Sequence, residues 1–132
     1  MAFIHSVCAH MATEKTVLIV DDSRISRMMT KAFIHSLFPD WQIAEAASGE
    51  EALQKAPTLD VPLILMDVNM PGMGGLAAAE QLRKLCPSSQ ITLLTANVQD
   101  ATRNKAQALG VGFLEKPVTE ERIHRLISAW SN

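Results

Sequence analysis

The sequence has few cysteines and no long hydrophobic stretch. Cys8 and Cys86 are too few for a disulfide framework, so we expect a reducing compartment, the cytoplasm. No apolar run approaches the length of a membrane span, which argues against a membrane protein or a membrane partner. Residues 1–12 lack the basic start and the sustained apolar stretch of a signal peptide.

An excess of charge of one sign is also missing. Lysine and arginine number 12 against 14 acidic residues, and the net charge of −2 gives no electrostatic reason to expect direct binding to nucleic acid. Neither a glycine-rich phosphate loop nor a serine–histidine–acid triad is present. What remains is ordinary for a globular protein, because 132 residues fit one domain and 48% of them are hydrophobic.

The amino-terminal segment, residues 1–13, reads as an appendage to that domain. His5, Cys8 and His10 could hold a soft metal ion, but no fourth ligand follows at a matched spacing. We therefore expect residues 1–13 to be a flexible extension or a cloning remnant, and residues 14–132 to form the folded domain.

Short apolar segments alternate with segments of helical periodicity along the folded part. The strands are expected at 15–20, 41–47, 63–67, 91–95 and 111–114. The helices are expected at 24–37, 48–56, 76–85, 99–109 and 120–130. Ser48 and Thr119 are expected to cap the helices that follow them. Such an alternation predicts an α/β fold with a five-stranded parallel sheet and helices on both faces.

The expected first helix is amphipathic. The residues that recur at helical spacing, and that we assign to the buried face, are Ile25, Met28, Met29, Ala32, Phe33 and Leu37, with the methionines as core filling. Arg24, Arg27 and Lys31 fall on another face, which we take to be solvated.

The stretch from Leu63 to Gly75 combines a buried strand with a loop suited to a ligand. Four apolar residues run directly into Asp67, which places this acid at the carboxyl edge of a parallel sheet, where α/β proteins bind ligands. Pro71 and the glycines after it end the strand and leave room beside the backbone. Taken alone, Asp67 could equally cap a turn.

Polar residues follow four of the five expected strands at the same edge, namely Asp21, Asp22, Asp67, Thr95 and Lys116. Clustered carboxylates repel one another and need a cation, and hard oxygen ligands select Mg²⁺ or a similar ion. A lysine can offset further negative charge, and a threonine hydroxyl can donate a hydrogen bond to an anionic oxygen.

This combination suits phosphoryl transfer, in which positioning and charge stabilisation do most of the work. A carboxylate can itself be the nucleophile and form an aspartyl phosphate, and Asp67 stands directly at a strand end beside an open loop. Each residue alone has a structural explanation, such as a helix cap or a surface lysine. Their coincidence at one edge favours function.

The motifs VLIVDDS, LILMDVNMPGMGG, LLTAN and FLEKP resemble those of response-regulator receiver domains of two-component signalling, over residues 14–131. The layout is similar to that of the single-domain chemotaxis regulators. The resemblance implies a flavodoxin-like fold with strand order 2-1-3-4-5.

The resemblance also implies roles for the edge residues. Asp67 would accept a phosphoryl group from a phosphohistidine of a sensor histidine kinase or a histidine phosphotransfer protein. Mg²⁺ or Mn²⁺ would be bound by Asp22, Asp67 and the backbone carbonyl of Asn69, with Asp21 acting through water. Lys116 would contact the phosphoryl oxygens, and its bond to Pro117 would be cis.

A switch follows from the same resemblance. Thr95 would shift toward the phosphoryl group, and Phe113 would follow it. The surface formed by the last two helices and the strand between them would then bind a downstream protein, without direct contact to nucleic acid or membrane. We therefore expect a signalling protein rather than a metabolic enzyme.

Some positions depart from the common receiver pattern. Gly74 replaces an acidic or amide residue, so the third helix is expected to be less well capped. Phe113 lacks the hydroxyl of the frequent tyrosine. Asn69 and Asn97 occupy positions that tune dephosphorylation in receivers.

Two other functions use related chemistry. A small Mg²⁺-dependent phosphohydrolase of the haloacid-dehalogenase type would also use an aspartyl nucleophile, but it carries a D-x-D motif after its first strand, and this chain has none. A receiver-shaped binding module that is never phosphorylated would not need the intact acid, threonine and lysine set.

Overall fold

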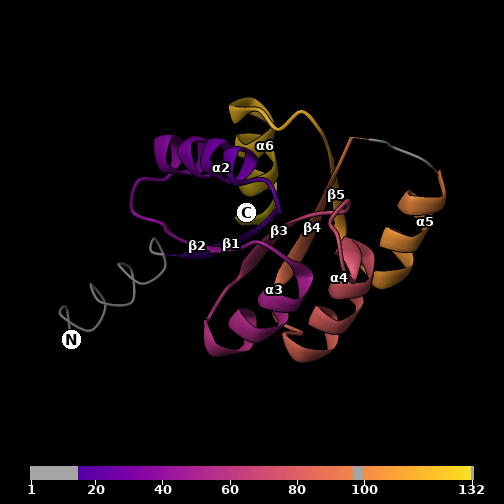
Figure 1. Ribbon diagram of the computed structural model, residues 1–132. Helices are drawn as coiled ribbons and strands as arrows, with labels where there is room; N and C mark the ends of the chain where they lie inside the picture. Colours follow the sequence, from indigo (N-terminus) through magenta and orange to yellow (C-terminus); the bar gives the residue numbers. More distant parts are fainter. Residues whose placement is uncertain (1–14, 97–99, 132) are drawn as a thin grey trace.

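The computed structural model describes residues 15–96 and 100–131, which form an α/β sandwich around one parallel sheet (Figure 1). The strands are β1 Thr16–Val20, β2 Gln42–Ala46, β3 Leu63–Asp67, β4 Gln90–Thr95 and β5 Gly112–Glu115. Every pairing is parallel, and the order is β2-β1-β3-β4-β5. Both the fold class and the strand order implied by the motifs are confirmed.

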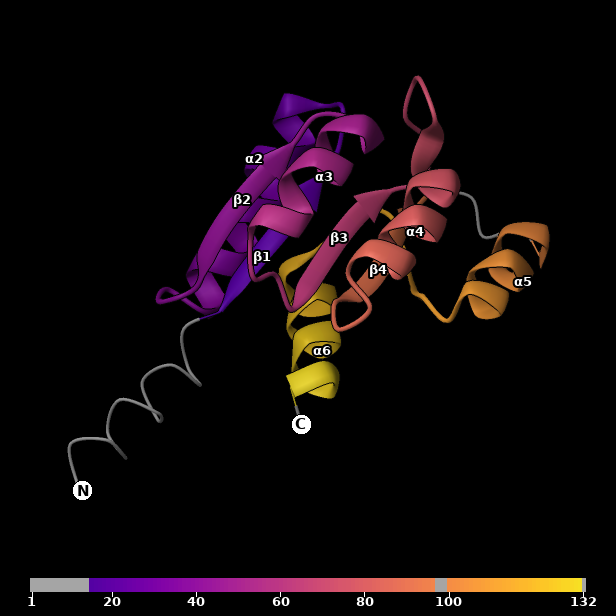
Figure 2. The same cartoon turned by 90° about the horizontal axis from the view of Figure 1, so that it is seen from below.

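Helices cover both faces of the sheet. They are α2 Arg24–Leu37, α3 Gly49–Lys55, α4 Gly74–Leu85, α5 Asp100–Leu109 and α6 Glu120–Ser131, with a 3-10 turn η1 at Ala56–Thr58. One face carries α2 and α6, and the other carries α3, α4 and α5 side by side (Figures 1 and 2). Right-handed crossovers between parallel strands distribute helices in this way.

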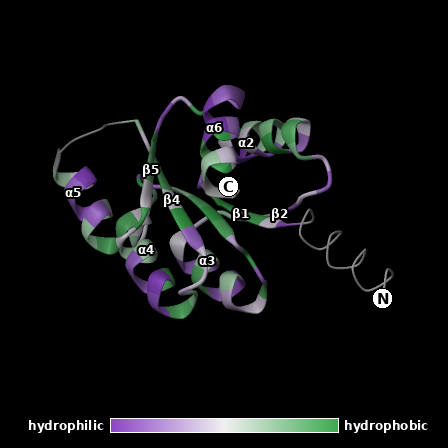
Figure 3. Cartoon of the chain, turned by 180° about the vertical axis from the view of Figure 1, so that it is seen from behind, coloured by the Kyte–Doolittle hydropathy of each residue, from purple (hydrophilic) through white to green (hydrophobic). Residues whose placement is uncertain are grey.

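The central strands are mainly apolar because both of their faces are covered. Successive side chains point to opposite faces, so each strand supplies two separate cores. The core under α3, α4 and α5 receives Leu18, Val20, Ile64, Met66, Ile91 and Leu93. The core under α2 and α6 receives Val17, Ile19, Leu63, Leu65 and Leu94. Figure 3 shows the resulting hydrophobic strands in the middle of the molecule.

Helix ends largely follow the sequence signals. Ser48 Oγ accepts a hydrogen bond from the Glu51 amide at 3.0 Å, and Thr119 Oγ1 accepts one from the Arg122 amide at 3.1 Å. In contrast, α4 begins without a side-chain cap, as expected from Gly74, which adopts φ +76°. The signals at Ser48 and Thr119 therefore mark the starts of α3 and α6.

The buried face of α2 differs in part from the predicted one. Phe33 and Leu37 pack partly buried against the core under α2 and α6, as predicted. Ile25, Met28 and Met29 are 71%, 58% and 52% exposed, so their assignment to the core was wrong. Ile34 and Arg27 also face inward, and the Arg27 side chain is only 15% exposed. Apolar and basic residues occur on several sides of this helix, so periodicity alone could not fix which side turns toward the sheet.

No described helix is both long and apolar enough to cross a membrane. The predicted extension at 1–13, with its histidines and cysteine, and Asn97 lie outside the described residues.

Candidate functional site

Three carboxylates meet at the carboxyl edge of the sheet. Asp21 and Asp22 follow β1, and Asp67 is the last residue of the neighbouring strand β3. One carboxylate oxygen from each lies within 4.8 Å of the others. Asp21 and Asp67 are 3% and 5% exposed, whereas Asp22 is open to solvent. The predicted convergence of these acids is confirmed.

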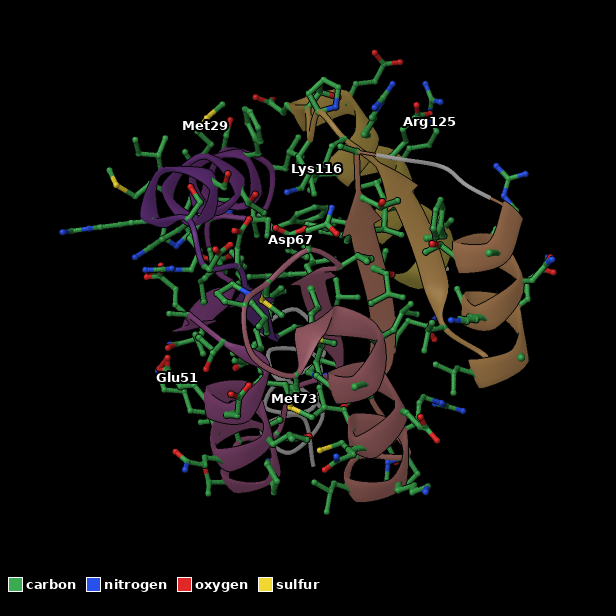
Figure 4. All side chains as sticks on the ribbon, turned by 45° about the vertical axis from the view of Figure 1, so that its right-hand side comes forward. Met29, Glu51, Asp67, Met73, Lys116 and Arg125 are labelled. Atoms are coloured by element: carbon green, nitrogen blue, oxygen red, sulfur yellow. The ribbon has the colours of Figure 1, made fainter. Side chains whose placement is uncertain are left out.

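Lys116, which follows the edge strand β5, brings a positive charge to these acids. Its ammonium nitrogen lies 3.1 Å from Asp67 Oδ2 and 4.0 Å from Asp21 Oδ2 (Figure 4). The Lys116 amide donates to the Thr95 carbonyl at 2.7 Å, which ties the loop after β5 to the end of β4. The Lys116–Pro117 peptide is cis, as the family resemblance implies.

Backbone amides hold the two buried acids in place. The Asn69 amide donates to Asp67 Oδ1 at 3.2 Å, and the Ser23 amide donates to Asp21 Oδ1 at 2.9 Å. In both cases the amide lies two residues beyond the acid, an arrangement that fixes the side chain against its own loop. Gly75 packs so tightly behind Asp67 that a Cβ there would stand 2.3 Å from the Asp67 carbonyl oxygen.

The charges of this site interact strongly. Burial raises the pKa of Asp21 above its ordinary value, and repulsion from Asp67 and Asp22 raises it further. The Ser23 amide and the Lys116 ammonium act in the opposite direction. Three carboxylates face the single Lys116 ammonium among the described residues, so the site is short of positive charge, and its hard oxygen donors fit a divalent ion such as Mg²⁺ or Mn²⁺.

The two expected switch residues occupy different depths. Thr95 is the last residue of β4 and is 2% exposed, at the same edge as the acids. Phe113 lies further from this edge, in β5 opposite Leu93, and packs partly buried against the core beneath α3, α4 and α5. The structure therefore brings Thr95 to the site and leaves Phe113 on the neighbouring surface strand.

A cleft opens beside Asp21 and Lys116. It has a volume of about 390 Å³ and is bordered by α2, by the end of β4 and by the loop after β5. Its lining includes Asp21, Met29, Ala96, Lys116 and Pro117. The site is thus accessible from the α2 side.

Arg27 is the site neighbour that sequence reasoning missed. Its Nη1 donates to the Asp21 carbonyl at 2.6 Å, and its Nε donates to Glu45 Oε1 of β2 at 3.1 Å. The two acceptors are 24 residues apart in sequence, so no local spacing predicts that Arg27 would contact both of them. Only the pairing of β1 with β2 brings Glu45 within reach of α2.

Comparisons with known proteins agree with this geometry. Residues 17–128 match the family model of the response regulator receiver domain. The chemotaxis protein CheY of Thermotoga maritima is 35% identical over 111 residues, which cover 83% of this chain and 91% of that protein. The autoinducer 1 sensor kinase/phosphatase LuxN of Vibrio harveyi is 32% identical over 117 residues. That match covers 89% of this chain but only 14% of LuxN.

Solved structures show the same likeness. The chemotaxis protein CheY4 of Vibrio cholerae superimposes with a TM-score of 0.80 at 29% identity, over 88% of this chain and 98% of CheY4. The response regulator TrrA of Thermotoga maritima, solved in complex with Mg²⁺-BeF, gives a TM-score of 0.77 at 28% identity. That superposition covers 87% of this chain and 97% of TrrA.

Proposed function

Because this chain belongs to the response regulator receiver family, we propose that Asp67 accepts a phosphoryl group from a phosphohistidine of a sensor histidine kinase or histidine phosphotransfer protein. The observation that carries the proposal is the position of the Asp67 carboxylate. It is buried, grouped with two other acids, and 3.1 Å from the Lys116 ammonium. A purely structural acid needs neither the crowding nor the adjoining cleft.

The residues divide the chemistry among them. An Asp67 carboxylate oxygen forms the new bond to phosphorus while the phosphorus–nitrogen bond of the phosphohistidine breaks, and the imidazole leaves with the bonding electrons and takes up a proton. Lys116 balances charge on the phosphoryl oxygens, and the Thr95 hydroxyl donates a hydrogen bond to one of them.

A divalent cation, Mg²⁺ or Mn²⁺, would neutralise the charge that gathers on the transferred group. Its ligands would be Asp22, Asp67 and the Asn69 backbone carbonyl, with Asp21 acting through water. Asp67 is held for this task by the Asn69 amide, and Asp21 by the Ser23 amide.

The output of this switch would be a change of surface rather than a metabolic reaction. Thr95 would move toward the phosphoryl group, Phe113 would follow, and the α5–β5–α6 surface would change its affinity for a downstream protein. The light anchoring of α5 supports this movement. Among the side chains of α5 that the structure describes, Ala106 alone is fully buried.

A mass measurement tests the phosphoacceptor. The protein is incubated with a small phosphodonor and Mg²⁺, and its intact mass is recorded for wild type, Asp67→Asn and the control Asp60→Asn, an exposed acid that precedes β3. Wild type and Asp60→Asn should gain one acid-stable, base-labile phosphoryl group, and EDTA should prevent it. Asp67→Asn should gain none.

Two results would contradict the proposal. An adduct that survives Asp67→Asn would place the phosphoryl group elsewhere. Steady turnover of unrelated phosphate esters would instead favour the aspartyl phosphohydrolase, although here the candidate nucleophile ends β3 and no D-x-D motif is present.

A further inference from the structure

We propose that Arg27 is a positioning residue for the metal site, because its guanidinium fixes the Asp21 carbonyl and so sets the direction of the Asp21 and Asp22 carboxylates. This inference deepens the proposed function, since it concerns the cation that the proposed phosphoryl transfer needs. Arg27 would not bind the cation itself; it would act through the acids that do.

The Arg27 guanidinium donates two hydrogen bonds at once. Nη1 donates to the Asp21 carbonyl oxygen at 2.6 Å, and Nε donates to the Glu45 carboxylate at 3.1 Å. The side chain is only 15% exposed, so solvent competes weakly for these donors. A guanidinium suits the task because its planar fork of donors can satisfy two acceptors in fixed directions.

The Asp21 carbonyl is a sensitive point of the loop. It belongs to the peptide plane that joins Asp21 to Asp22, so its orientation helps to set the backbone angles on either side. The rest of Asp21 is already held, because its amide donates to the Ala46 carbonyl at 3.1 Å and its carboxylate accepts from the Ser23 amide at 2.9 Å. With Arg27 on the carbonyl, each polar group of this residue has a partner.

Asp22 depends most on this arrangement. Its side chain is exposed, so packing does not decide where its carboxylate points. The backbone must aim it toward Asp21 and Asp67, and Arg27 fixes the peptide plane that precedes it. Residues outside the ligand set that orient the ligands commonly change metal affinity by about 10–100-fold when they are replaced.

Glu45 and Lys31 supply the internal control. Lys31 also approaches the Glu45 carboxylate, at 3.7 Å, and it lies on the same helix with 41% exposure of its side chain. Among the described residues, the hydrogen bond to the Asp21 carbonyl oxygen comes from Arg27 and not from Lys31. A variant at Lys31 therefore removes a positive charge and one Glu45 contact without touching the loop.

The test compares Mg²⁺ binding by calorimetry for wild type, Arg27→Met, Arg27→Lys and Lys31→Met, each first shown to be folded by circular dichroism. Arg27→Met should raise the Mg²⁺ dissociation constant roughly tenfold. Arg27→Lys should recover part of the affinity, because lysine restores the charge but not the fork. Lys31→Met should stay within about twofold of wild type, as expected for an exposed pair.

A second measurement needs no metal. The Asp21 amide donates to the Ala46 carbonyl of β2, and the Ser23 amide donates to the Asp21 carboxylate. Hydrogen exchange of both amides should become roughly tenfold faster in Arg27→Met and stay unchanged in Lys31→Met. Unchanged Mg²⁺ affinity in folded Arg27→Met would overturn the inference. An equal loss of Mg²⁺ affinity in Lys31→Met would overturn it as well. A wild type that binds Mg²⁺ yet gains no phosphoryl group would refute the proposed function and leave the role of Arg27 standing.

Discussion

The helices α2 and α5 follow two strands that end at the acidic edge, β1 and β4, yet they are held to the molecule in different ways. Ile34 anchors α2 in the core that it shares with α6, and Arg27 ties it to the β1 loop and to β2. In the described part of α5, Ala106 is the fully buried side chain, and most of the others are exposed. Figure 1 shows α5 at the outer end of its layer, beside α4 and β5.

The difference matches the work proposed for each side. The acids proposed to bind the cation need fixed directions, and α2 is fastened next to them by apolar burial and by polar contacts. A surface that changes when Asp67 is phosphorylated needs a helix that moves at low cost, and few buried apolar contacts provide this. One edge of the sheet thus combines a rigid side and a lightly anchored side.

The largest effect should come from loosening the rigid side. Ile34→Ala removes a fully buried side chain, and we expect it to lower the free energy of unfolding by about 3 kcal/mol. Urea denaturation measures this loss. The matched control is Met29→Ala on the same helix, whose side chain is 52% exposed and whose effect should stay within about 0.5 kcal/mol. Equal losses in the two variants would restore the buried face that periodicity predicted.

A direct comparison of the two helices is the next test. Native-state hydrogen exchange should find the amides of residues 104–108 in α5 at least about tenfold less protected than those of residues 31–36 in α2, because α5 can open without disturbing the core. The exchange is followed by NMR at neutral pH. Equal protection of both helices would contradict the division into a rigid side and a lightly anchored one.

The smallest effect concerns the strain of the acids themselves. Asp21→Asn should raise the free energy of unfolding of the metal-free protein by about 1 kcal/mol at neutral pH, since it removes a buried charge that Asp67 and Asp22 repel. The same change should weaken Mg²⁺ binding. The exposed acid Asp60 provides the control, because Asp60→Asn should change neither quantity measurably.

The pH dependence of this gain follows from the direction of the Asp21 pKa. The folded-state pKa is raised above the ordinary 3.8, so between these two values the native protein binds more protons than the unfolded chain. The contribution of Asp21 to stability therefore falls as the pH rises through that window. The advantage of Asp21→Asn should therefore shrink as the pH falls from the raised folded-state pKa toward 3.8 and be lost below 3.8, and an advantage that instead grew in acid would contradict the assignment.

The sequence alone located most of the site. Buried parallel strands read as apolar runs, and a polar residue directly after such a run has to lie at the carboxyl edge, which is why Asp21, Asp67 and Lys116 were placed correctly. Capping signals were equally local, as the bonds at Ser48 and Thr119 show. These features depend on neighbours in the chain, so the chain order is sufficient to predict them.

The tertiary structure alone decided the orientation of α2. Its apolar and basic residues are spread around the helix, so the inward side is chosen by the shape of the α6 face and by acceptors on other elements. Arg27 turns inward because the Asp21 carbonyl and Glu45 meet beside it once β1 and β2 pair, and Met29 is left outside. Asp67, the proposed phosphoacceptor, can be located from the sequence, but Arg27, the residue proposed to orient the neighbouring acids, becomes visible only after the strands have paired.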